Sequence, residues 1–172
     1  DVQTYREYKL MPYSRKQLYS IVADVASYPR FVPYCADARI LSAPAPLSGT
    51  RGTRMEAELA VAFLGFRETY VSTVTCHPYE SVEAVASSAT PLFKSLTTTW
   101  GFAPAPGHAP SSAPSPDSAP DDDAAPTMLT LDLAYAFASP LHAAAAHAFF
   151  GQVSRAMVQA FEARCLRVYG PG

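Results

Sequence analysis

The sequence has 172 residues, 49% of them hydrophobic and 12% aromatic, which is enough to bury one substantial core and argues against two independent domains. It contains no run of about 18 apolar residues, so we expect a soluble or peripheral protein without a membrane-spanning helix. The three cysteines, Cys35, Cys76 and Cys165, are odd in number and far apart. They argue against a disulfide framework or a structural zinc site and favour a reducing compartment.

The formal charge of −2 is dominated by one acidic stretch. Four of the 15 acidic side chains, Asp117 and Asp121 to Asp123, lie in it, which leaves 11 acidic against 13 basic side chains elsewhere. Because Lys and Arg are scattered, we expect no nucleic-acid partner, whereas weak attraction to an anionic membrane is compatible with the sequence. The chain begins at Asp1 without an initiator Met, so we expect a processed chain from which any targeting peptide is missing.

The first elements are a strand and two short helices. Residues 5–10 predict the strand, and Ser14 is a favourable N-cap for a helix that begins at Arg15 and ends before Pro29. The apolar side chains of this helix recur at three- and four-residue intervals: Leu18, Ile21, Val22 and Val25. In the aromatic segment that follows, Pro29 and Pro33 are four residues apart, which confines any helix there to about one turn.

A period of two then predicts an antiparallel sheet. Its strands are expected at residues 55–63, 66–76, 81–87, 96–102 and 128–137. In the first of these, Met55, Leu59, Val61 and Phe63 face one way and the glutamates face the other, which is typical of a half-buried strand. With the N-terminal strand, the curved sheet has about six or seven strands.

The segment from Pro104 to Pro126 differs in composition from the rest of the chain. It consists mostly of Pro, Ala, Ser and Asp and has no large apolar side chain, so it cannot bury enough surface to offset its ordering entropy. We therefore predict a disordered insert at residues 104–126 between two strands of a single domain that covers residues 1–172. A Pro-rich partner-binding segment is the alternative interpretation.

The chain ends in a long helix. Ser139 as N-cap and Pro140 at the first helical position predict its start, and Gly170 with Pro171 predicts its end about thirty residues later. A strand, two short helices, an antiparallel sheet and a closing helix indicate an α+β fold in which a curved sheet wraps around the long helix. Patterning leaves open whether a filled core or a cavity lies between them, although alanines on the helix favour space for a ligand.

Catalytic and metal-binding motifs are missing from the sequence. The four histidines form no H-E-x-x-H pair, and no G-x-S-x-G, P-loop or G-x-G-x-x-G motif occurs, so we expect no metal and no catalytic cofactor. Cys35 is the one candidate nucleophile, and a small apolar wall residue is the favoured interpretation of it. Apolar residues at turns are unusual and indicate contact with a membrane or partner, or else cover by the Pro29–Pro33 segment. The residues expected there are Leu64, Phe66, Leu92 and Phe93.

Several motifs in the same order resemble the mitochondrial coenzyme Q-binding protein family, in the polyketide cyclase-like branch of the START superfamily. They are Tyr28-Pro29-Arg30-Phe31-Val32-Pro33-Tyr34-Cys35, Phe66-x-Glu68-x-Tyr70-x-Ser72-x-Val74, Leu96-x-Thr98-x-Trp100-x-Phe102 and Phe149-Phe150 followed by Met157-Val158-x-Ala160-Phe161-Glu162. The resemblance extends from about Tyr5 to Pro171. The insert and Tyr34, where many relatives carry Trp, depart from the family pattern.

This resemblance implies a helix-grip, START-like fold and a tunnel that binds ubiquinone or a related isoprenoid quinone. It implies non-enzymatic binding and delivery of ubiquinone or its precursors, peripheral contact with the matrix side of the mitochondrial inner membrane, and quinone-biosynthesis or respiratory proteins as further partners. The expected ligand-binding residues are Tyr28, Phe31, Val32, Met55, Leu59, Val61, Phe63, Leu96, Trp100, Phe149, Val153, Met157 and Phe161. Two alternatives stay open, a polyketide aromatase/cyclase-like enzyme and a ribosome-interacting relative of a bacterial toxin.

Overall fold

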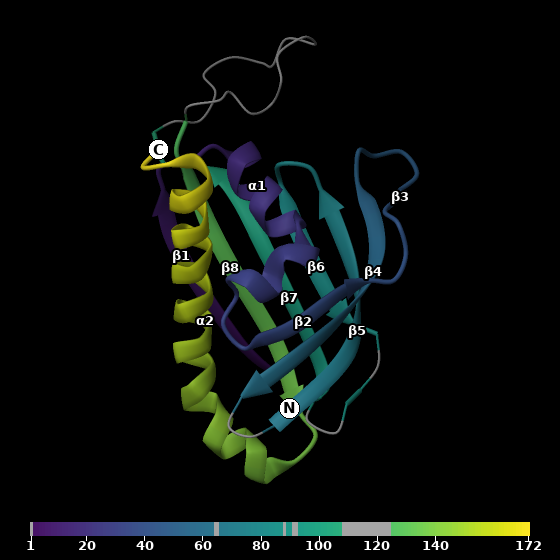
Figure 1. Ribbon diagram of the computed structural model, residues 1–172. Coiled ribbons are helices and arrows are strands. Elements are labelled where there is room, and N and C mark those ends of the chain that lie inside the picture. The colour runs from purple at the N-terminus through teal and green to yellow at the C-terminus, as the bar shows by residue number, and fades with distance from the viewer. Residues whose placement is uncertain (1, 64–65, 88, 91–92, 108–124) are drawn as a thin grey trace.

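The computed structural model describes residues 2–63, 66–87, 89–90, 93–107 and 125–172, with the backbone alone at 63, 66 and 140–149. One curved antiparallel sheet and one long helix make up most of the fold (Figure 1). The sheet has the order β1-β8-β7-β6-β5-β4-β2, and the two-residue strand β3 pairs with β4. The predicted α+β helix-grip fold is confirmed, with eight strands in place of six or seven.

Alternation of buried and exposed side chains explains the strands. Their bounds are Gln3–Met11 (β1), Cys35–Ile40 (β2), Ala45–Pro46 (β3), Thr53–Phe63 (β4), Phe66–His77 (β5), Ser81–Ala86 (β6), Phe93–Pro104 (β7) and Thr127–Phe137 (β8). In β8, Leu129, Leu131, Leu133 and Tyr135 are buried on one face. The inner face of the sheet therefore carries the core, as its period of two predicts.

Two short helices cross the concave face of the sheet. Helix α1, Arg15–Ala23, begins with a capping box in which Ser14 and Gln17 exchange side-chain and backbone hydrogen bonds. A 3-10 helix, η1, Val25–Arg30, follows directly. The two short helices expected after the first strand are confirmed, and the first ends before Pro29 as predicted. Val25, which we assigned to the first helix, instead begins η1, and Pro29 lies inside η1, near its end.

Helix α2, Pro140–Tyr169, closes the open side of the sheet (Figure 1). Its bounds agree with those predicted, with Ser139 as N-cap and Gly170, at φ 81°, as C-cap. The Tyr13 hydroxyl donates to the Gly170 carbonyl at 2.7 Å, and the Tyr169 hydroxyl donates to the Gln17 carbonyl at 3.1 Å. These two bonds fix the C-terminal end of α2 against α1 and the segment that connects β1 to it.

Strands β7 and β8 stay paired as far as Pro104 and Thr127. Beyond this pair Ala105 is buried, and its N–H donates to the Pro126 carbonyl at 3.1 Å. Pro104, Ala105 and Pro126, which we assigned to the insert, therefore belong to the end of the β7–β8 ladder. The rest of the predicted disordered segment, residues 108–124, lies outside the described residues.

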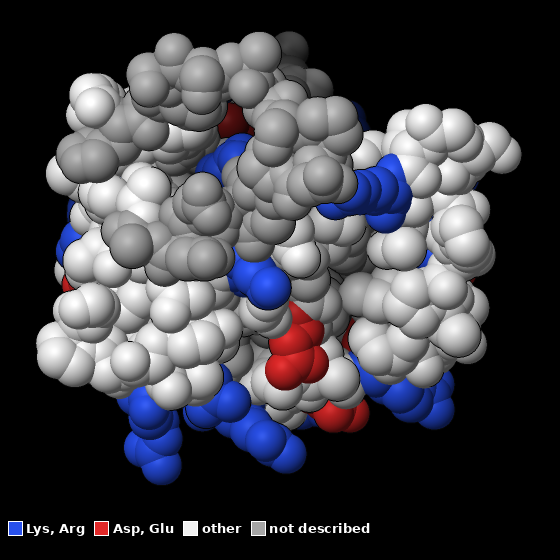
Figure 2. Space-filling view, turned by 90° about the horizontal axis from the view of Figure 1, so that it is seen from above, with Lys and Arg blue, Asp and Glu red and all other residues white. Residues whose placement is uncertain are grey.

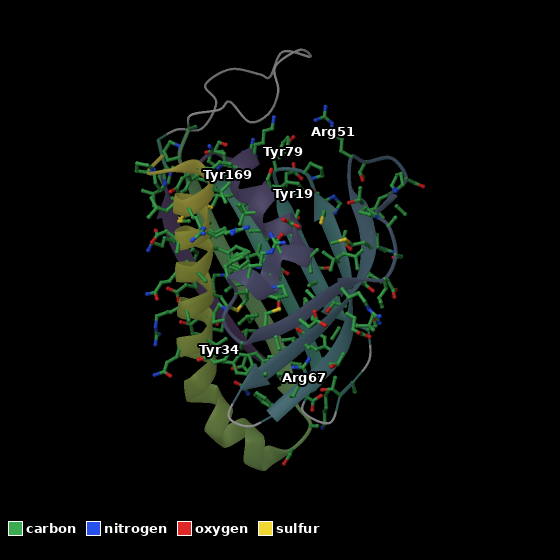
Figure 3. The ribbon with its side chains drawn as sticks, viewed as in Figure 1. Tyr19, Tyr34, Arg51, Arg67, Tyr79 and Tyr169 are labelled. Carbon is green, nitrogen blue, oxygen red and sulfur yellow. The ribbon has the colours of Figure 1, made fainter. Side chains whose placement is uncertain are left out.

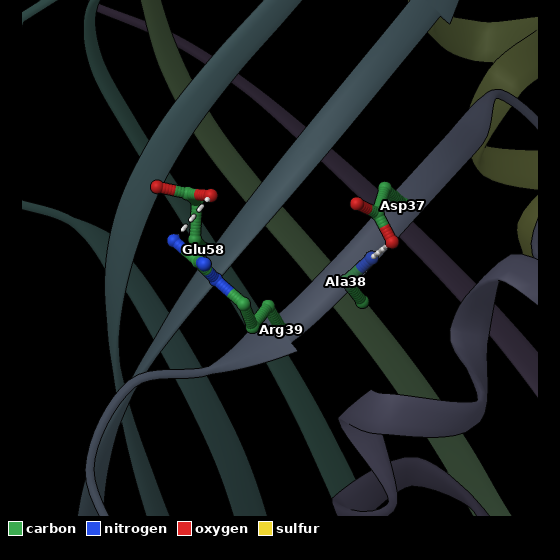
Figure 4. A network of polar contacts seen from close by, with 4 residues as sticks. All are labelled: Asp37, Ala38, Arg39 and Glu58. Atoms are coloured by element: carbon green, nitrogen blue, oxygen red, sulfur yellow. Dashed lines mark hydrogen bonds and ion pairs between the residues drawn. The ribbon is translucent and has the colours of Figure 1, made fainter.

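Strand β2 forms one edge of the sheet and pairs with β4. On its outer side Arg39 and Glu58 lie directly opposite each other and form an exposed ion pair of 3.2 Å, while the Asp37 carboxylate accepts the N–H of Ala38 at 2.9 Å (Figure 4). Such an exposed pair contributes about 0–1 kcal/mol. The pairing shifts between Cys35 and Asp37, and this bulge ends the regular ladder next to the pocket described below.

Candidate functional site

An apolar pocket lies between the inner face of the sheet, helix α2 and the segment from η1 to β2. Its volume is about 150 Å³. The lining residues are Val25, Tyr28, Val32, Pro33, Tyr34, Cys35, Leu59, Val61, Tyr70, Ser72, Val74, Val82, Ala84, Phe93, Leu96, Thr98, Trp100, Leu133, Phe150, Val153 and Met157. Among these residues none is Asp, Glu, His, Lys or Arg.

The floor of the pocket follows from strand alternation. Tyr70, Ser72 and Val74 are two residues apart on β5, so their side chains project from the same face. A row of directly paired residues crosses the sheet: Val74, Ala84, Thr98 and Leu133. Because Ala84 carries only a methyl group, the middle of this row leaves space above the sheet.

The walls come from two segments that are distant in sequence. Phe150, Val153 and Met157 recur at helical spacing on α2 and face the sheet. Opposite them, η1 contributes Val25 and Tyr28. The Tyr28 hydroxyl donates to the carbonyl of Val22, so this polar group is already satisfied within the protein.

The turn between η1 and β2 completes the pocket. Tyr34 has a φ of 66°, an unusual conformation for a residue with a side chain, and its carbonyl accepts the N–H of Ala62 at 2.9 Å. This conformation turns the chain so that both Tyr34 and Cys35 line the pocket. Tyr34 and Arg67 lie at the end of the molecule where β4 meets β5, opposite Tyr19 and Tyr79 (Figure 3).

Burial governs the titratable groups of the pocket. It raises the pKa of the Cys35 thiol to about 11 and that of the Tyr70 hydroxyl to about 12. Burial also raises the pKa of Tyr28. All three groups are therefore protonated at neutral pH, and Cys35 offers very little thiolate for nucleophilic attack.

Eight of the predicted ligand-binding residues line this pocket: Tyr28, Val32, Leu59, Val61, Leu96, Trp100, Val153 and Met157. Three others lie in the core beside it. Met55 is buried next to Val74, Phe31 packs on Tyr28 and Phe161, and Phe161 is fully buried behind Trp100. The side chains of Phe63 and Phe149 lie outside the part of the chain that the structure describes.

The residues predicted to touch a membrane are only partly described. Leu64, Leu92 and the side chain of Phe66 lie outside the described residues. Phe93 is only 6% exposed, packs against Phe137 and Phe150, and lines the pocket. The structure therefore places Phe93 inside the protein, because residue 93 begins β7 on its inner face.

Sequence reasoning missed several lining residues. The alternation that predicted Leu59 and Val61 also holds in the other strands. Applied there, it predicts four further lining residues: Ser72, Val74, Ala84 and Leu133. Tyr34 could not be predicted in this way, because its position depends on its own left-handed conformation, which leaves no periodic signal. Cys35, which we interpreted as a small apolar wall residue, does line the pocket.

The face of the described residues seen in Figure 2 shows no concentrated patch of one charge. On the face shown in Figure 2, Lys and Arg side chains are spread over the surface, with Asp and Glu between some of them. Among the described residues, no three His, Cys, Asp or Glu side chains gather as metal ligands. No helix in the same part of the chain combines the length and hydropathy needed to cross a bilayer.

Comparison with known proteins places the chain in a family. Residues 11–162 match the family model described as polyketide cyclase / dehydrase and lipid transport. Coenzyme Q-binding protein COQ10 homolog B, mitochondrial, of Xenopus laevis is 34% identical over 96% of this chain and 59% of its own length, so the chain spans less than two thirds of it. Coenzyme Q-binding protein COQ10 of Dictyostelium discoideum is 30% identical over 94% of this chain and 68% of its own length.

Two further likenesses concern other activities. Ribosome association toxin RatA of Pseudomonas aeruginosa is 28% identical over 94% of each chain. The crystal structure of the Zhui aromatase/cyclase from a Streptomyces species superposes with a TM-score of 0.75 over all of this chain and 99% of that one, at 15% identity, and so shows the fold alone. The pocket, the family match and the two coenzyme Q-binding relatives agree: the chain belongs to the polyketide cyclase / dehydrase and lipid transport family and, within it, to the coenzyme Q-binding protein family.

Proposed function

We propose that this protein binds ubiquinone, or a hydrophobic precursor of it, and delivers it without changing it chemically. The observation that carries the proposal is the pocket between sheet and helix, which is lined by apolar and aromatic side chains and by no charged residue. Burial of an isoprenoid quinone there would contribute about 25 cal/mol for each Å² of apolar surface removed from water. The relatives named as coenzyme Q-binding proteins supply the ligand class.

The size of the pocket favours one ring-sized group rather than a whole lipid. Its volume is about 150 Å³, and a cavity of similar volume is large enough for a benzene molecule. Sites that enclose a drug-sized ligand usually measure about 300–1,000 Å³. We therefore place the substituted ring of the quinone inside the pocket and its isoprenoid tail along the opening.

The absence of reaction chemistry in the pocket supports a binding role. General acid–base catalysis needs a group whose pKa is close to the working pH. The pocket offers no Asp, Glu, His or Lys among its described lining residues, and the pKa values of Cys35 and Tyr70 are raised to about 11 and 12. A quinone held there would meet protonated hydroxyls and a protonated thiol.

Delivery requires access to a membrane, because a long isoprenoid chain is insoluble in water. Val61, Tyr70 and Phe93 line the pocket close in sequence to the hairpin at residues 63–66 and to residues 91–92. We place these apolar segments against the lipid surface. The names of the mitochondrial relatives support a mitochondrial location, and within it we propose the matrix side of the inner membrane.

Two competing functions have an observation behind them. An aromatase/cyclase shares the fold, and a ribosome association toxin shares 28% of its sequence over nearly the whole chain. The discriminating experiment is organic extraction of the purified protein, followed by mass spectrometry, with ribosome sedimentation in parallel. The proposal predicts recovery of a prenylated quinone and no co-sedimentation. Recovery of no lipid together with stoichiometric ribosome binding would replace it with the toxin-like function.

A further inference from the structure

Two hydroxyls on the same face of β5, those of Tyr70 and Ser72, line the pocket without a hydrogen bond to a described residue. Ser72 is 2% exposed and lines the pocket between Tyr70 and Val74 on the inner face of β5. Its hydroxyl makes no hydrogen bond with any described residue. A buried hydroxyl that leaves water without finding a partner destabilises the folded chain, so such a group needs an explanation.

The other three buried Ser and Thr side chains of the described chain all have a hydrogen-bond partner. Ser14 accepts the N–H of Gln17, Thr127 donates to the Tyr13 carbonyl at 2.8 Å, and Ser154 donates to the Phe150 carbonyl at 2.8 Å. Ser14 thus caps a helix, Thr127 links two distant segments, and Ser154 bonds back to its own helix. Ser72 is the exception among these four buried hydroxyls, and it is the one of the four that lines the pocket.

The neighbours of Ser72 explain why it has no partner. Directly across the sheet it faces Ala57 on β4 and Ala86 on β6, whose methyl groups can neither donate nor accept a hydrogen bond. Alanine on both sides also leaves the hydroxyl uncovered within the pocket. The backbone groups of β5 are engaged in the ladders with β4 and β6, so the hydroxyl is left without a protein partner on this face.

We infer that Ser72 donates a hydrogen bond to an oxygen on the ring of the bound ligand, with Tyr70 as a second donor on the same strand face. This inference rests on the proposed function and narrows it. A quinone ring with its alkoxy substituents offers only acceptors, so donors from the protein are what it needs for recognition. The ligand class is thus a ring that bears carbonyl or alkoxy oxygens, attached to a hydrocarbon tail.

The raised pKa of Tyr70, about 12, keeps its hydroxyl a donor throughout the neutral range. Tyr28 and Cys35 do not compete for the role, because Tyr28 donates to the Val22 carbonyl and the Cys35 thiol lies 3.6 Å from the Asp37 carbonyl. The oxygen-bearing part of the ligand should therefore lie over β5.

The experiment compares Ser72→Ala with the wild-type chain and with Thr69→Val, which removes a hydroxyl from the outer, exposed side of the same strand. Decylubiquinone and n-decylbenzene, which has the same tail and no ring oxygen, serve as probes in equilibrium dialysis. We expect Ser72→Ala to bind decylubiquinone roughly three- to tenfold more weakly and n-decylbenzene unchanged, because one neutral hydrogen bond is lost. Thr69→Val should match the wild type with both probes.

Two further measurements separate recognition from a structural role. Infrared spectra of bound decylubiquinone should show a carbonyl stretch shifted to lower frequency in the wild type, with the shift reduced in Ser72→Ala. The empty Ser72→Ala protein should melt at the same temperature as the wild type or higher, because an unsatisfied hydroxyl is removed. Equal affinity of wild type and Ser72→Ala for decylubiquinone would overturn the inference alone, whereas failure of the wild type to bind it would overturn the proposed function as well.

Discussion

The ring of Phe161 packs against the indole of Trp100, with centroids 4.6 Å apart and planes inclined by 56°. Phe161 is fully buried and does not line the pocket, whereas Trp100 does. Phe161 also contacts Tyr28 and Phe31 edge-on at 5.5 and 5.1 Å. One side chain of α2 therefore supports the pocket wall contributed by β7 and the segment around η1 at the same time.

Phe161→Ala should destabilise the protein by about 3–5 kcal/mol, because it leaves a cavity behind Trp100 into which neighbouring rings cannot fully relax. Urea unfolding followed by circular dichroism measures this change. Leu166→Ala on the same helix is the control, since Leu166 is 54% exposed and its truncation should change stability by no more than about 0.5 kcal/mol. Equal stabilities for the two variants would show that Phe161 does not support the pocket wall.

The free energy of unfolding should fall as the pH rises from about 9 to about 12. Burial raises the pKa of Cys35 to about 11 and those of Tyr70 and Cys165 to about 12, above the values of the unfolded chain. In this window the folded state holds more protons than the unfolded state, so the free energy of unfolding decreases as the pH rises. Below about pH 8 these groups are protonated in both states and do not change the free energy of unfolding. Urea titrations at a series of pH values test this, and Cys165→Ala should show a shallower decline. A flat or rising profile up to about pH 11 would contradict the burial of these groups.

Removal of residues 108–124, with a short Gly-Ser bridge from Gly107 to Ala125, should leave the melting temperature and quinone binding almost unchanged. The segment has no large apolar side chain to offer the core, and halving a loop changes its closure cost by only about 0.6 kcal/mol. Ala105 and Pro126 must be retained, because they are joined by a backbone hydrogen bond at the end of β7 and β8. Differential scanning calorimetry compares the two chains. A melting temperature lower by about ten degrees would mean that the segment packs on the domain.

Leu64→Asp and Phe66→Asp should each weaken binding to liposomes that contain anionic lipid by about tenfold or more. Loss of one large apolar side chain from the lipid interface costs about 1.5–3 kcal/mol, and about 1.4 kcal/mol corresponds to a factor of ten. Liposome sedimentation measures the effect. Leu10→Asp is the matched control, because Leu10 is 56% exposed on β1, away from the hairpin. Equal losses from all three variants would show that the hairpin is not the contact site.

Much of the fold could be predicted because it depends on local patterns. A few consecutive residues are enough to predict the capping box at Ser14, the start of α2 at Pro140 and its end at Gly170, and the alternation in β8. The division of the predicted first helix at Asp24 could not be predicted, because α1 and η1 together keep the apolar spacing of one continuous helix.

The pocket residues could be predicted only where the side of the strand on which a residue lies decides whether it lines the pocket. Leu59, Val61 and Trp100 line the pocket because alternation aims them inward. Met55 and Phe161 face inward as well, yet neighbouring side chains cover them. The periodicity of a sequence does not indicate how deeply a residue lies in the core. Ser72 was part of a recognised motif, but its importance depends on Ala57 and Ala86, which become its neighbours only in the sheet.

The emission of Trp100 gives the most direct test of quinone binding in the pocket. The chain has one tryptophan, which is 3% exposed and lines the pocket, so a quinone held there should quench it efficiently. Titration of the purified protein with decylubiquinone should give saturable quenching that ends at one equivalent per chain. Quenching that rises linearly without saturation, as for free tryptophan in solution, would contradict the account.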